Sequence, residues 1–257
     1  MRARDVVAAA RRVTALTGAG VSTDSGIPDF RGASGAGTAL GREFTLDDYL
    51  SDPAVRRAAW RVRLAHPVWA AEPNAAHRAL AELERAGRVR SLLTQNVDGL
   101  HQRAGSVAVV ELHGSWSGTV CVDCGATGSM SAALDRVRAG EEDPDCPACG
   151  GVLRSSTVAF GQPLDADVLR EARTAVLDCD LVLVAGTSLA VDPAAALVGL
   201  AVRVGTPVVI CNDEPTPYDA TATAVVRGPV GESLPELVAV PVVESGPLRT
   251  WGDPSTW

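Results

Sequence analysis

The sequence lacks any long uninterrupted apolar run, although 46% of its 257 residues are hydrophobic. A membrane-spanning helix needs about 20 such residues in succession, so we expect a globular protein without membrane contact. The amino-terminal stretch MRARDVVAAARRV also lacks the apolar centre of a secretory signal peptide, because charged residues interrupt it. A cytoplasmic location is therefore expected.

Basic charge is scarce as well. The chain has 31 acidic and 23 basic side chains, which gives a formal net charge of -8. Proteins that bind nucleic acids directly usually present an excess of basic charge, so no nucleic-acid partner is expected. An acidic chain suits basic partners such as lysine-bearing protein segments, although solubility is the commoner reason for a mild acidic charge.

Cysteine is also infrequent, with six residues in the chain, but four of them form two CxxC pairs. Cys121 and Cys124 lie in CVDC, and Cys146 and Cys149 lie in CPAC, with 21 residues between the pairs. Two such knuckles supply the four thiolates of a tetrahedral zinc site, and because they fill the coordination sphere, the ion would be structural. A redox dithiol and four unrelated core thiols are the alternatives.

Short apolar runs alternate with helical patterns along the chain. The runs cover residues 13–17, 89–94, 107–112, 181–185 and 207–211, and the helical patterns cover residues 74–86, 165–177 and 193–204. Asp192 is the expected cap of the last helix. Continuous apolar runs of this length suit strands that are buried on both faces, so the alternation predicts an α/β fold with a doubly wound parallel sheet.

Two stretches interrupt this alternation and are expected to form a smaller inserted lobe. Residues 33–72 begin with the flexible composition ASGAGTALG and continue as a helical pattern, and residues 119–154 contain the cysteine pairs. Residues 1–32, 73–118 and 155–257 would then form a Rossmann-like domain that binds a dinucleotide.

A glycine-rich loop, GAGVSTDSGIPDFRG, follows the first apolar run. Gly18 and Gly20 match the start of a dinucleotide-binding fingerprint, but Thr23 stands where the third glycine belongs. A GxG pair alone fits a phosphate-binding loop and an ordinary tight turn about equally well. Gly186-Thr187-Ser188 and Asn212 follow two further runs, and such turns at strand ends hold the phosphates and riboses of a dinucleotide.

Polar residues also follow two neighbouring runs, in TQNVDGLH at 94–101 and in ELHG at 111–114. Open α/β sheets place their sites at the carboxyl ends of parallel strands. Of the four histidines, His113 is the best placed to act as a general base near neutral pH. His77 is expected to pack within a helix, His101 to cap the next helix, and His66 to lie at the surface.

These segments resemble, in order, the motifs of the sirtuins, which are NAD-dependent protein-lysine deacylases. The resemblance covers residues 5–240 and rests on GAGVSTDSGIPDFRG, EPNAAHRALAELE, TQNVDGLH, HG, the paired CxxC knuckles, FGQ, GTSLAVDP and VVICND. It implies that NAD is consumed and is not a hydride carrier. The acyl-lysine oxygen attacks C1′ of the nicotinamide ribose, nicotinamide leaves, and the acyl group ends on the 2′-oxygen of ADP-ribose.

The resemblance also implies roles for individual residues. His113 would be the general base and Asn96 a second catalytic residue. The NAD-binding residues would be Gly18, Ala19, Gly20, Ile27, Asp29, Phe30, Arg31, Gln95, Asn96, Asp98, Gly186, Thr187, Ser188 and Asn212. An acyl-lysine peptide would add as a further strand beside Thr157, Val158, Phe160 and Gly161.

Three departures from the family pattern stand out. The linker ASGAGTAL lacks the aromatic residue that many sirtuins carry after the cofactor loop. Trp60-x-x-Arg63 replaces the Tyr-x-x-Arg pair associated with acidic acyl groups, so acetyl-lysine is the expected substrate. FGQ replaces the commoner FGE, which should be tolerated.

Three alternative functions remain open. Protein mono-ADP-ribosylation would use the same NAD site and break the same first bond. A hydride-transferring dehydrogenase is disfavoured by the missing third glycine. The cysteine module could also belong to an adaptor that binds nucleic acid or protein.

Overall fold

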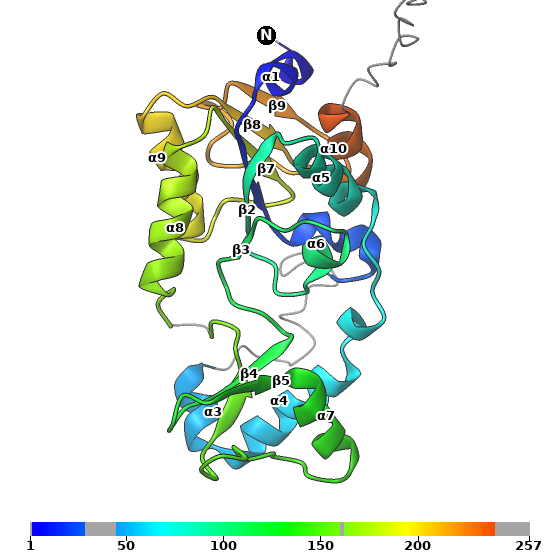
Figure 1. The fold of residues 1–257 in the computed structure, drawn as a ribbon, viewed down its shortest axis with the longest axis vertical. Helices are drawn as coiled ribbons and strands as arrows, with labels where there is room; N and C mark the ends of the chain where they lie inside the picture. Colours follow the sequence, from blue (N-terminus) through cyan, green and yellow to red (C-terminus); the bar gives the residue numbers. More distant parts are fainter. Residues whose placement is uncertain (1, 29–44, 160–161, 240–257) are drawn as a thin grey trace, which may run out of the picture.

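The computed structural model describes residues 2–28, 45–159 and 162–239, which form a larger and a smaller lobe (Figure 1). The larger lobe contains a six-stranded parallel sheet in the order β3-β2-β1-β7-β8-β9. This corresponds to the strand order 3-2-1-4-5-6 of dinucleotide-binding sheets, in which the order reverses at the first strand. The strands are β1 (Val13–Thr17), β2 (Val89–Thr94), β3 (Val109–Glu111), β7 (Leu181–Ala185), β8 (Val208–Cys211) and β9 (Ala224–Val226). The predicted doubly wound parallel sheet is confirmed.

The central strands end level with one another at one edge of the sheet. Thr17, the last residue of β1, pairs with Thr94 of β2 and with Ala185 of β7. β3 is shorter than the predicted run, because the Glu84 carboxylate accepts hydrogen bonds from the main-chain N–H groups of residues 107 and 108 before the strand begins. The sequence does not predict β9, since three apolar residues are too short a run to indicate a strand.

Helices cover both faces of the sheet. α1 (Ala3–Ala9), α5 (Ala75–Arg85) and α10 (Val230–Val238) share one hydrophobic core with the sheet, and α8 (Ala166–Leu177) and α9 (Ala194–Arg203) share the other. The predicted cap of α9 is wrong. That helix begins directly after Pro193, so Asp192 lies one position too early and no side chain caps the helix.

The smaller lobe combines segments from both predicted insertions. Its helices are α3 (Leu46–Ser51), α4 (Pro53–Ala65) and α7 (Met130–Arg138), and its antiparallel sheet contains β4 (Gly118–Cys121), β5 (Thr127–Ser129) and β6 (Leu153–Ser155). Trp60 of α4 is fully buried against Met130 and Leu134 of α7 and against Leu153 of β6. The expected zinc-binding and helical lobe is therefore present, and the exact domain boundaries stay a prediction.

Arg63 lies one helical turn after Trp60, as the Trp-x-x-Arg pattern requires. Its guanidinium carbon is 5.6 Å from the centre of the Trp60 ring and 5.8 Å from that of Tyr49. A phenol does lie beside Arg63, but it comes from α3, and the Tyr49 hydroxyl donates to the main-chain oxygen of Leu153 (2.8 Å).

The acidic run EEDPD is bound to arginines of the same lobe. Asp143 accepts a hydrogen bond from Arg56 Nε at 2.8 Å, and both side chains are largely buried. Glu142 lies 3.6 Å from Arg61 at the surface. Within the described parts of the chain, no helix is long and apolar enough to cross a membrane.

Candidate active site

The loops after β1 and β7 pack so closely that glycine is required at both. A Cβ atom on Gly18 would lie 2.7 Å from Thr187 Cβ, and one on Gly20 would lie 2.9 Å from Gly186 Cα. Gly186 has φ +61°, and a Cβ there would meet the Val21 nitrogen at 2.5 Å. The glycines therefore join two strand-end loops at the point where the strand order reverses, which is where such sheets bind dinucleotides.

The residues around these glycines fit a polar ligand. Ser188 Oγ is buried and has no hydrogen-bond partner among the described residues. Gln95 Nε2 donates to Thr187 Oγ1 at 2.9 Å, which connects the β7 loop to the turn after β2. The Gly186 N–H donates to the Cys211 oxygen at 3.0 Å and so brings Asn212 next to the same loops. An unsatisfied buried hydroxyl beside a close-packed glycine cradle fits NAD.

The turn after β2 is connected to the glycine loop by a network centred on Ser22. Asn96 Nδ2 donates to the Gly18 oxygen (3.1 Å) and to Ser22 Oγ (3.0 Å). Ser22 Oγ in turn donates to Asp98 Oδ2 at 2.7 Å. Burial raises the pKa of Asp98, against the hydrogen bonds from the Leu100 N–H and from Ser22, which lower it. Ile27 lies nearby, because its N–H donates to the Ser22 oxygen.

Two buried histidines lie behind this network. His77 Nδ1 accepts from the Asn74 N–H, so its Nε2 carries the proton and faces Ser22 Oγ at 3.4 Å. His101 Nε2 lies 2.9 Å from Thr17 Oγ1, and the rings of His77 and His101 meet edge to face at 4.8 Å. Burial lowers the pKa of His77 to about 4 and that of His101 to about 3. Both imidazoles are therefore neutral at physiological pH.

The sequence does not identify Ser22 or His77 as site residues. His77 does pack within a helix as predicted, since it belongs to the capping box of α5, but it also contacts the Ser22 network. His101 lies inside α6 (Leu100–Arg103) rather than capping it. His66 is half-buried against Trp116, with ring centres 4.1 Å apart, so the surface prediction is wrong.

His113 has the geometry of a general base. Its Nδ1 lies 3.0 Å from the Gln95 main-chain oxygen. A carbonyl oxygen can only accept, so Nδ1 carries the proton and Nε2 keeps its lone pair. Burial lowers the pKa of His113, against the bond to Gln95, which raises it, and the ring is therefore neutral near pH 7.

The segment expected to bind the substrate lies against His113. The Val158 N–H donates to the His113 oxygen at 2.9 Å. Gly114 has φ +71°, and a Cβ atom there would lie 2.2 Å from the Ser156 oxygen, so only glycine permits this approach. Gln162 Oε1 accepts from the Ala159 N–H (3.2 Å), a role that a glutamate oxygen could also fill. A pocket of about 400 Å³ lined by Gly114, Val158 and neighbouring residues opens beside this segment.

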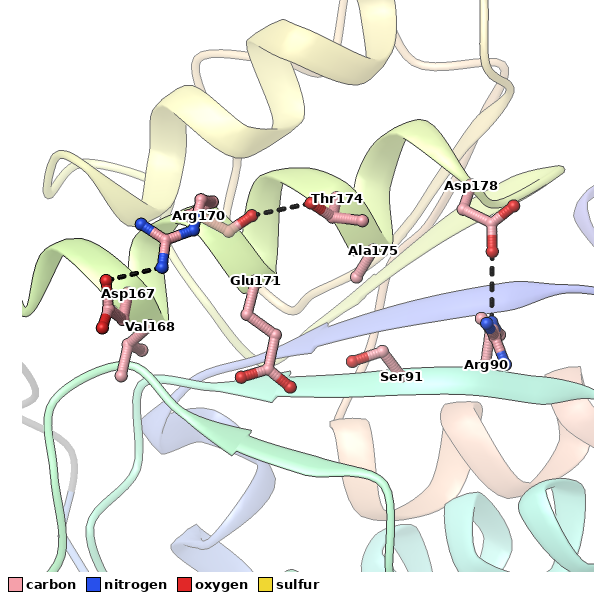
Figure 2. Close-up of a pocket in the computed structure, with 9 residues that line it drawn as sticks. All are labelled: Arg90, Ser91, Asp167, Val168, Arg170, Glu171, Thr174, Ala175 and Asp178. Carbon is pink, nitrogen blue, oxygen red and sulfur yellow. Dashed lines mark hydrogen bonds and ion pairs between the residues drawn. The ribbon is translucent and has the colours of Figure 1, made fainter.

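Five of the predicted site residues lie outside the described residues: Asp29, Phe30, Arg31, Phe160 and Gly161. A larger pocket of about 610 Å³ lies elsewhere, between α8 and β2 (Figure 2). Its arginines are already paired, Arg90 with Asp178 at 3.1 Å and Arg170 with Asp167 at 2.6 Å. None of the predicted site residues lines it, so we do not assign it to the active site.

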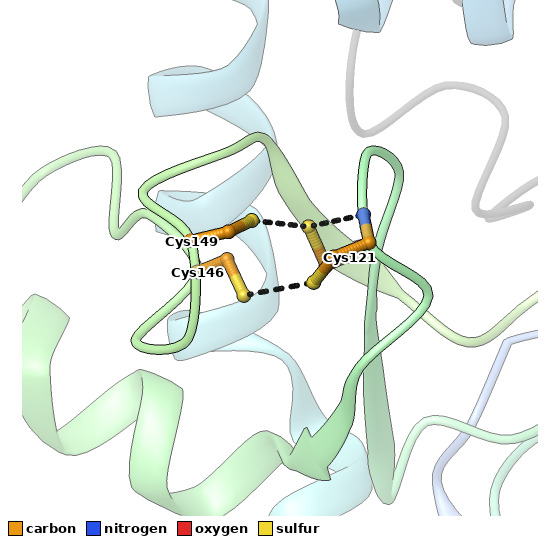
Figure 3. A group of neighbouring side chains, drawn as sticks. Cys121, Cys146 and Cys149 are labelled. Atoms are coloured by element: carbon orange, nitrogen blue, oxygen red, sulfur yellow. Dashed lines mark hydrogen bonds between the residues drawn. The ribbon is translucent and has the colours of Figure 1, made fainter.

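The four paired cysteines converge in the smaller lobe (Figure 3). Cys121 Sγ lies 3.6 Å from Cys149 Sγ, Cys124 Sγ lies 3.7 Å from Cys146 Sγ, and all four sulfurs lie within 4.8 Å of one another. Tetrahedral zinc with bonds of about 2.3 Å places neighbouring sulfurs about 3.8 Å apart. The four sulfurs therefore fit one structural zinc ion, as predicted.

The sheet, its strand-end site and the cysteine module together define a Rossmann-type protein whose main site fits NAD and whose smaller lobe fits a structural zinc ion. The family model described as "Sir2 family" matches residues 18–193. The chain is 50% identical to NAD-dependent protein deacetylase 2 of Streptomyces coelicolor, over 88% of this chain and 96% of that protein. It is 44% identical to NAD-dependent protein deacetylase 1 of Pyrobaculum aerophilum, over 87% of each chain. The chain belongs to the Sir2 family, which confirms the resemblance to sirtuins.

Solved structures agree with this assignment. A structure described as "Structural Basis for the Mechanism and Regulation of Sir2 Enzymes" superposes with a TM-score of 0.83 at 39% identity, over 92% of this chain and 94% of that one. A complex of Sir2 with a p53 peptide and NAD+ gives a TM-score of 0.82 at 37% identity, over 91% of this chain and 94% of that one. A third structure holds Sir2 with a deacetylated p53 peptide and 3′-O-acetyl ADP-ribose (TM-score 0.83, 36% identity, 93% and 97% coverage).

Proposed function

We propose that this protein is an NAD-dependent protein-lysine deacetylase that transfers the acetyl group to ADP-ribose and releases nicotinamide. The observation that carries the proposal is the setting of His113. Its ring is held by the same turn that presents Asn96 and Asp98, and its main chain is bonded to Val158 of the expected substrate segment. Relatives that are named deacetylases, and a related structure that contains 3′-O-acetyl ADP-ribose, support the same reaction.

We assign the residues of this chain to three functions. His113 Nε2 would take a proton from a ribose hydroxyl, since Nδ1 is already a donor to Gln95. The Ser22 network would fix Asn96 and Asp98, and Asp98 would hold the carboxamide of nicotinamide together with Ile27. The phosphates and the adenosine end would contact Gly18, Ala19, Gly20, Gln95, Gly186, Thr187, Ser188 and Asn212, and the cofactor loop with Asp29, Phe30 and Arg31 would complete the site.

The partner would be an acyl-lysine segment of another protein. An extended peptide would add beside Thr157 and Val158, next to Phe160 and Gly161, so that its lysine reaches His113 and NAD. Exclusion of water at that point favours attack by the acyl oxygen over hydrolysis of NAD. A cytoplasmic location and the lack of a nucleic-acid partner stay predictions.

One experiment tests the reaction and the base together. The purified protein is incubated with NAD and an acetyl-lysine peptide, and mass spectrometry follows nicotinamide, free-lysine peptide and acetyl-ADP-ribose. The chain itself contains no lysine, so the deacetylated lysine can come only from the peptide. His113→Asn is the matched variant, because its amide N–H can still donate to the Gln95 oxygen while the base at Nε2 is lost.

The expected result is acetyl-ADP-ribose from the wild type and a loss of at least about 100-fold with His113→Asn at an unchanged melting temperature. Retained activity in the variant would remove His113 from the mechanism. Transfer of labelled ADP-ribose to protein without any acyl-lysine would instead favour the alternative, protein mono-ADP-ribosylation. The deacetylase proposal would be refuted if the wild type formed no acetyl-ADP-ribose from any acyl-lysine peptide.

A further inference from the structure

The segment after β8 surrounds Asn212 with hydrogen bonds on three sides. The Asn212 N–H donates to the Val226 oxygen (3.1 Å), and its main-chain oxygen accepts from Arg227 Nη1 (3.0 Å). The Asn212 side-chain amide donates to the Glu214 oxygen at 2.7 Å. Oδ1 accepts no hydrogen bond from any described residue, although Asn212 is only 8% exposed. Asn212 therefore presents one open acceptor, which suits a hydroxyl donor such as that of a ribose.

Arg227 contacts this asparagine, and both terminal nitrogens of its guanidinium already have partners. Its Nη1 binds the Asn212 oxygen, and its Nη2 forms an ion pair with Asp219 Oδ2. Asp219 is fixed in turn by the hydroxyl of buried Thr216, which donates to Oδ1 at 2.7 Å. Burial alone would raise the pKa of Asp219, but the hydrogen bonds from Thr216 and Arg227 lower it overall, so the carboxylate is ionised at neutral pH.

An arginine beside the adenosine ribose is the group that accommodates the 2′-phosphate of NADP in dinucleotide-binding sheets. Here the ion pair with Asp219 removes Arg227 from that use. The exposed carboxylates of Asp213 and Glu214 flank Asn212 and would repel a phosphate. The segment thus suits a free ribose hydroxyl and opposes a phosphorylated one.

We propose that Asp219 and Arg227 are positioning residues that make the adenosine end of the site select NAD over NADP. The inference rests on the proposed NAD-dependent function and adds to it the residues that set dinucleotide specificity. They act through Asn212: Arg227 holds its main chain, and Asp219 keeps Arg227 from binding phosphate.

Titration calorimetry with NAD and with NADP tests the proposal without any turnover. The wild type should bind NAD at least about tenfold more tightly than NADP. Asp219→Asn removes the charge that occupies Arg227 and should narrow this ratio at least about tenfold through a gain in NADP affinity. Arg227→Gln should weaken NAD binding and gain no NADP affinity. Asp135→Asn, which removes the same charge from a surface pair with Arg138 in the other lobe, should leave the ratio unchanged.

If the ion pair had a purely structural role, Asp219→Asn would weaken the binding of NAD and of NADP in parallel and leave the ratio of their affinities unchanged. That result would overturn the inference. Melting temperatures of the variants identify any loss of folding. An Asp219→Asn variant that melts with the wild type and still excludes NADP would also overturn it. If the wild type bound no NAD at all, the proposed function would fail together with this inference, whereas NAD binding with an unchanged ratio would overturn the inference alone.

Discussion

Lowering the pH from 7 to 5 should destabilise the fold through His77 and His101. Both imidazoles are fully buried behind the Ser22 network, and burial lowers their pKa from 6.5 to about 4 and about 3. His101 Nδ1 has no hydrogen-bond partner among the described residues, so a proton there would be buried without an acceptor. The unfolded chain accepts protons at these rings below pH 6.5, and the folded chain does not.

The sign and the size of the effect follow from proton linkage. The stability due to the two neutral rings is fully present above pH 6.5 and is lost as the pH falls toward 4 for His77 and 3 for His101. Each ring favours unfolding by about 1.4 kcal/mol per pH unit in this range. Over the 1.5 units between pH 6.5 and pH 5, two rings amount to about 4 kcal/mol, a large part of the roughly 5–15 kcal/mol that stabilises a typical domain.

The assay is urea unfolding at pH 7, 6 and 5, with the double variant His77→Gln/His101→Gln as the control. Glutamine at position 77 can still return a hydrogen bond to the Asn74 N–H, as in a capping box. Glutamine at position 101 can still donate to Thr17 Oγ1, which His101 Nε2 contacts. His66, His113 and all carboxylates are present in both proteins, so the difference in slope isolates the two rings. Equal loss of stability in wild type and variant between pH 7 and pH 5 would refute the reasoning.

Two further predictions concern the zinc module and the approach of the substrate segment. Chelation of zinc should lower the melting temperature by at least about 4 °C, because the four thiolates of the cysteine module are then left without the ion that joins the two knuckles. Calorimetry with and without chelator measures this difference. An unchanged melting temperature would exclude a structural ion. Gly114→Ala should cost about 1–2 kcal/mol from its positive φ alone. The clash with the Ser156 oxygen should also displace His113 and abolish deacetylation, while Gly87→Ala, at a similar φ of +73° with open space around it, should cost stability without loss of activity.

Much of the fold could be predicted because its signals are local. Five of the six strands lie within the runs that the sequence predicts, and β1 and β7 are buried along their whole length, as strands covered on both faces require. The zinc site could be predicted for the same reason, since each CxxC knuckle supplies two ligands from a single turn. The position of His113 at a strand end is also visible in the sequence, but its tautomer depends on the Gln95 oxygen, 18 residues away.

The rest of the site depends on contacts between distant residues, which no periodicity reveals. Ser22 and His77 meet across 55 residues, and Ser22 and Asp98 across 76. The helical spacing of His77 predicts a buried core residue, and the same spacing gives no sign that the ring also contacts Ser22. His66 lies in a predicted insertion beside Pro67, and its contact with the Trp116 ring, far along the chain, is not visible in the sequence. The predicted Asp192 cap is wrong by a single position, because Pro193 stands at the N-cap of α9.

In the glycine loop, Gly18 and Gly20 meet two requirements: room for a ligand phosphate and close packing against the loop after β7. Read as a fingerprint, Gly18 and Gly20 leave room for a phosphate, and the missing third glycine is a defect. In the fold both glycines face the Gly186-Thr187 loop at distances that no side chain permits, so they are needed even before a ligand binds. At position 23, where the fingerprint has its third glycine, Thr23 begins a short 3-10 turn, and its hydroxyl donates to the Gly20 oxygen at 3.1 Å. That turn follows directly on Ser22, the residue that connects Asn96 and Asp98. The turn that replaces a third glycine therefore connects residues 18–20 of the loop to Ser22, and through Ser22 to Asn96 and Asp98, the residues proposed to hold nicotinamide.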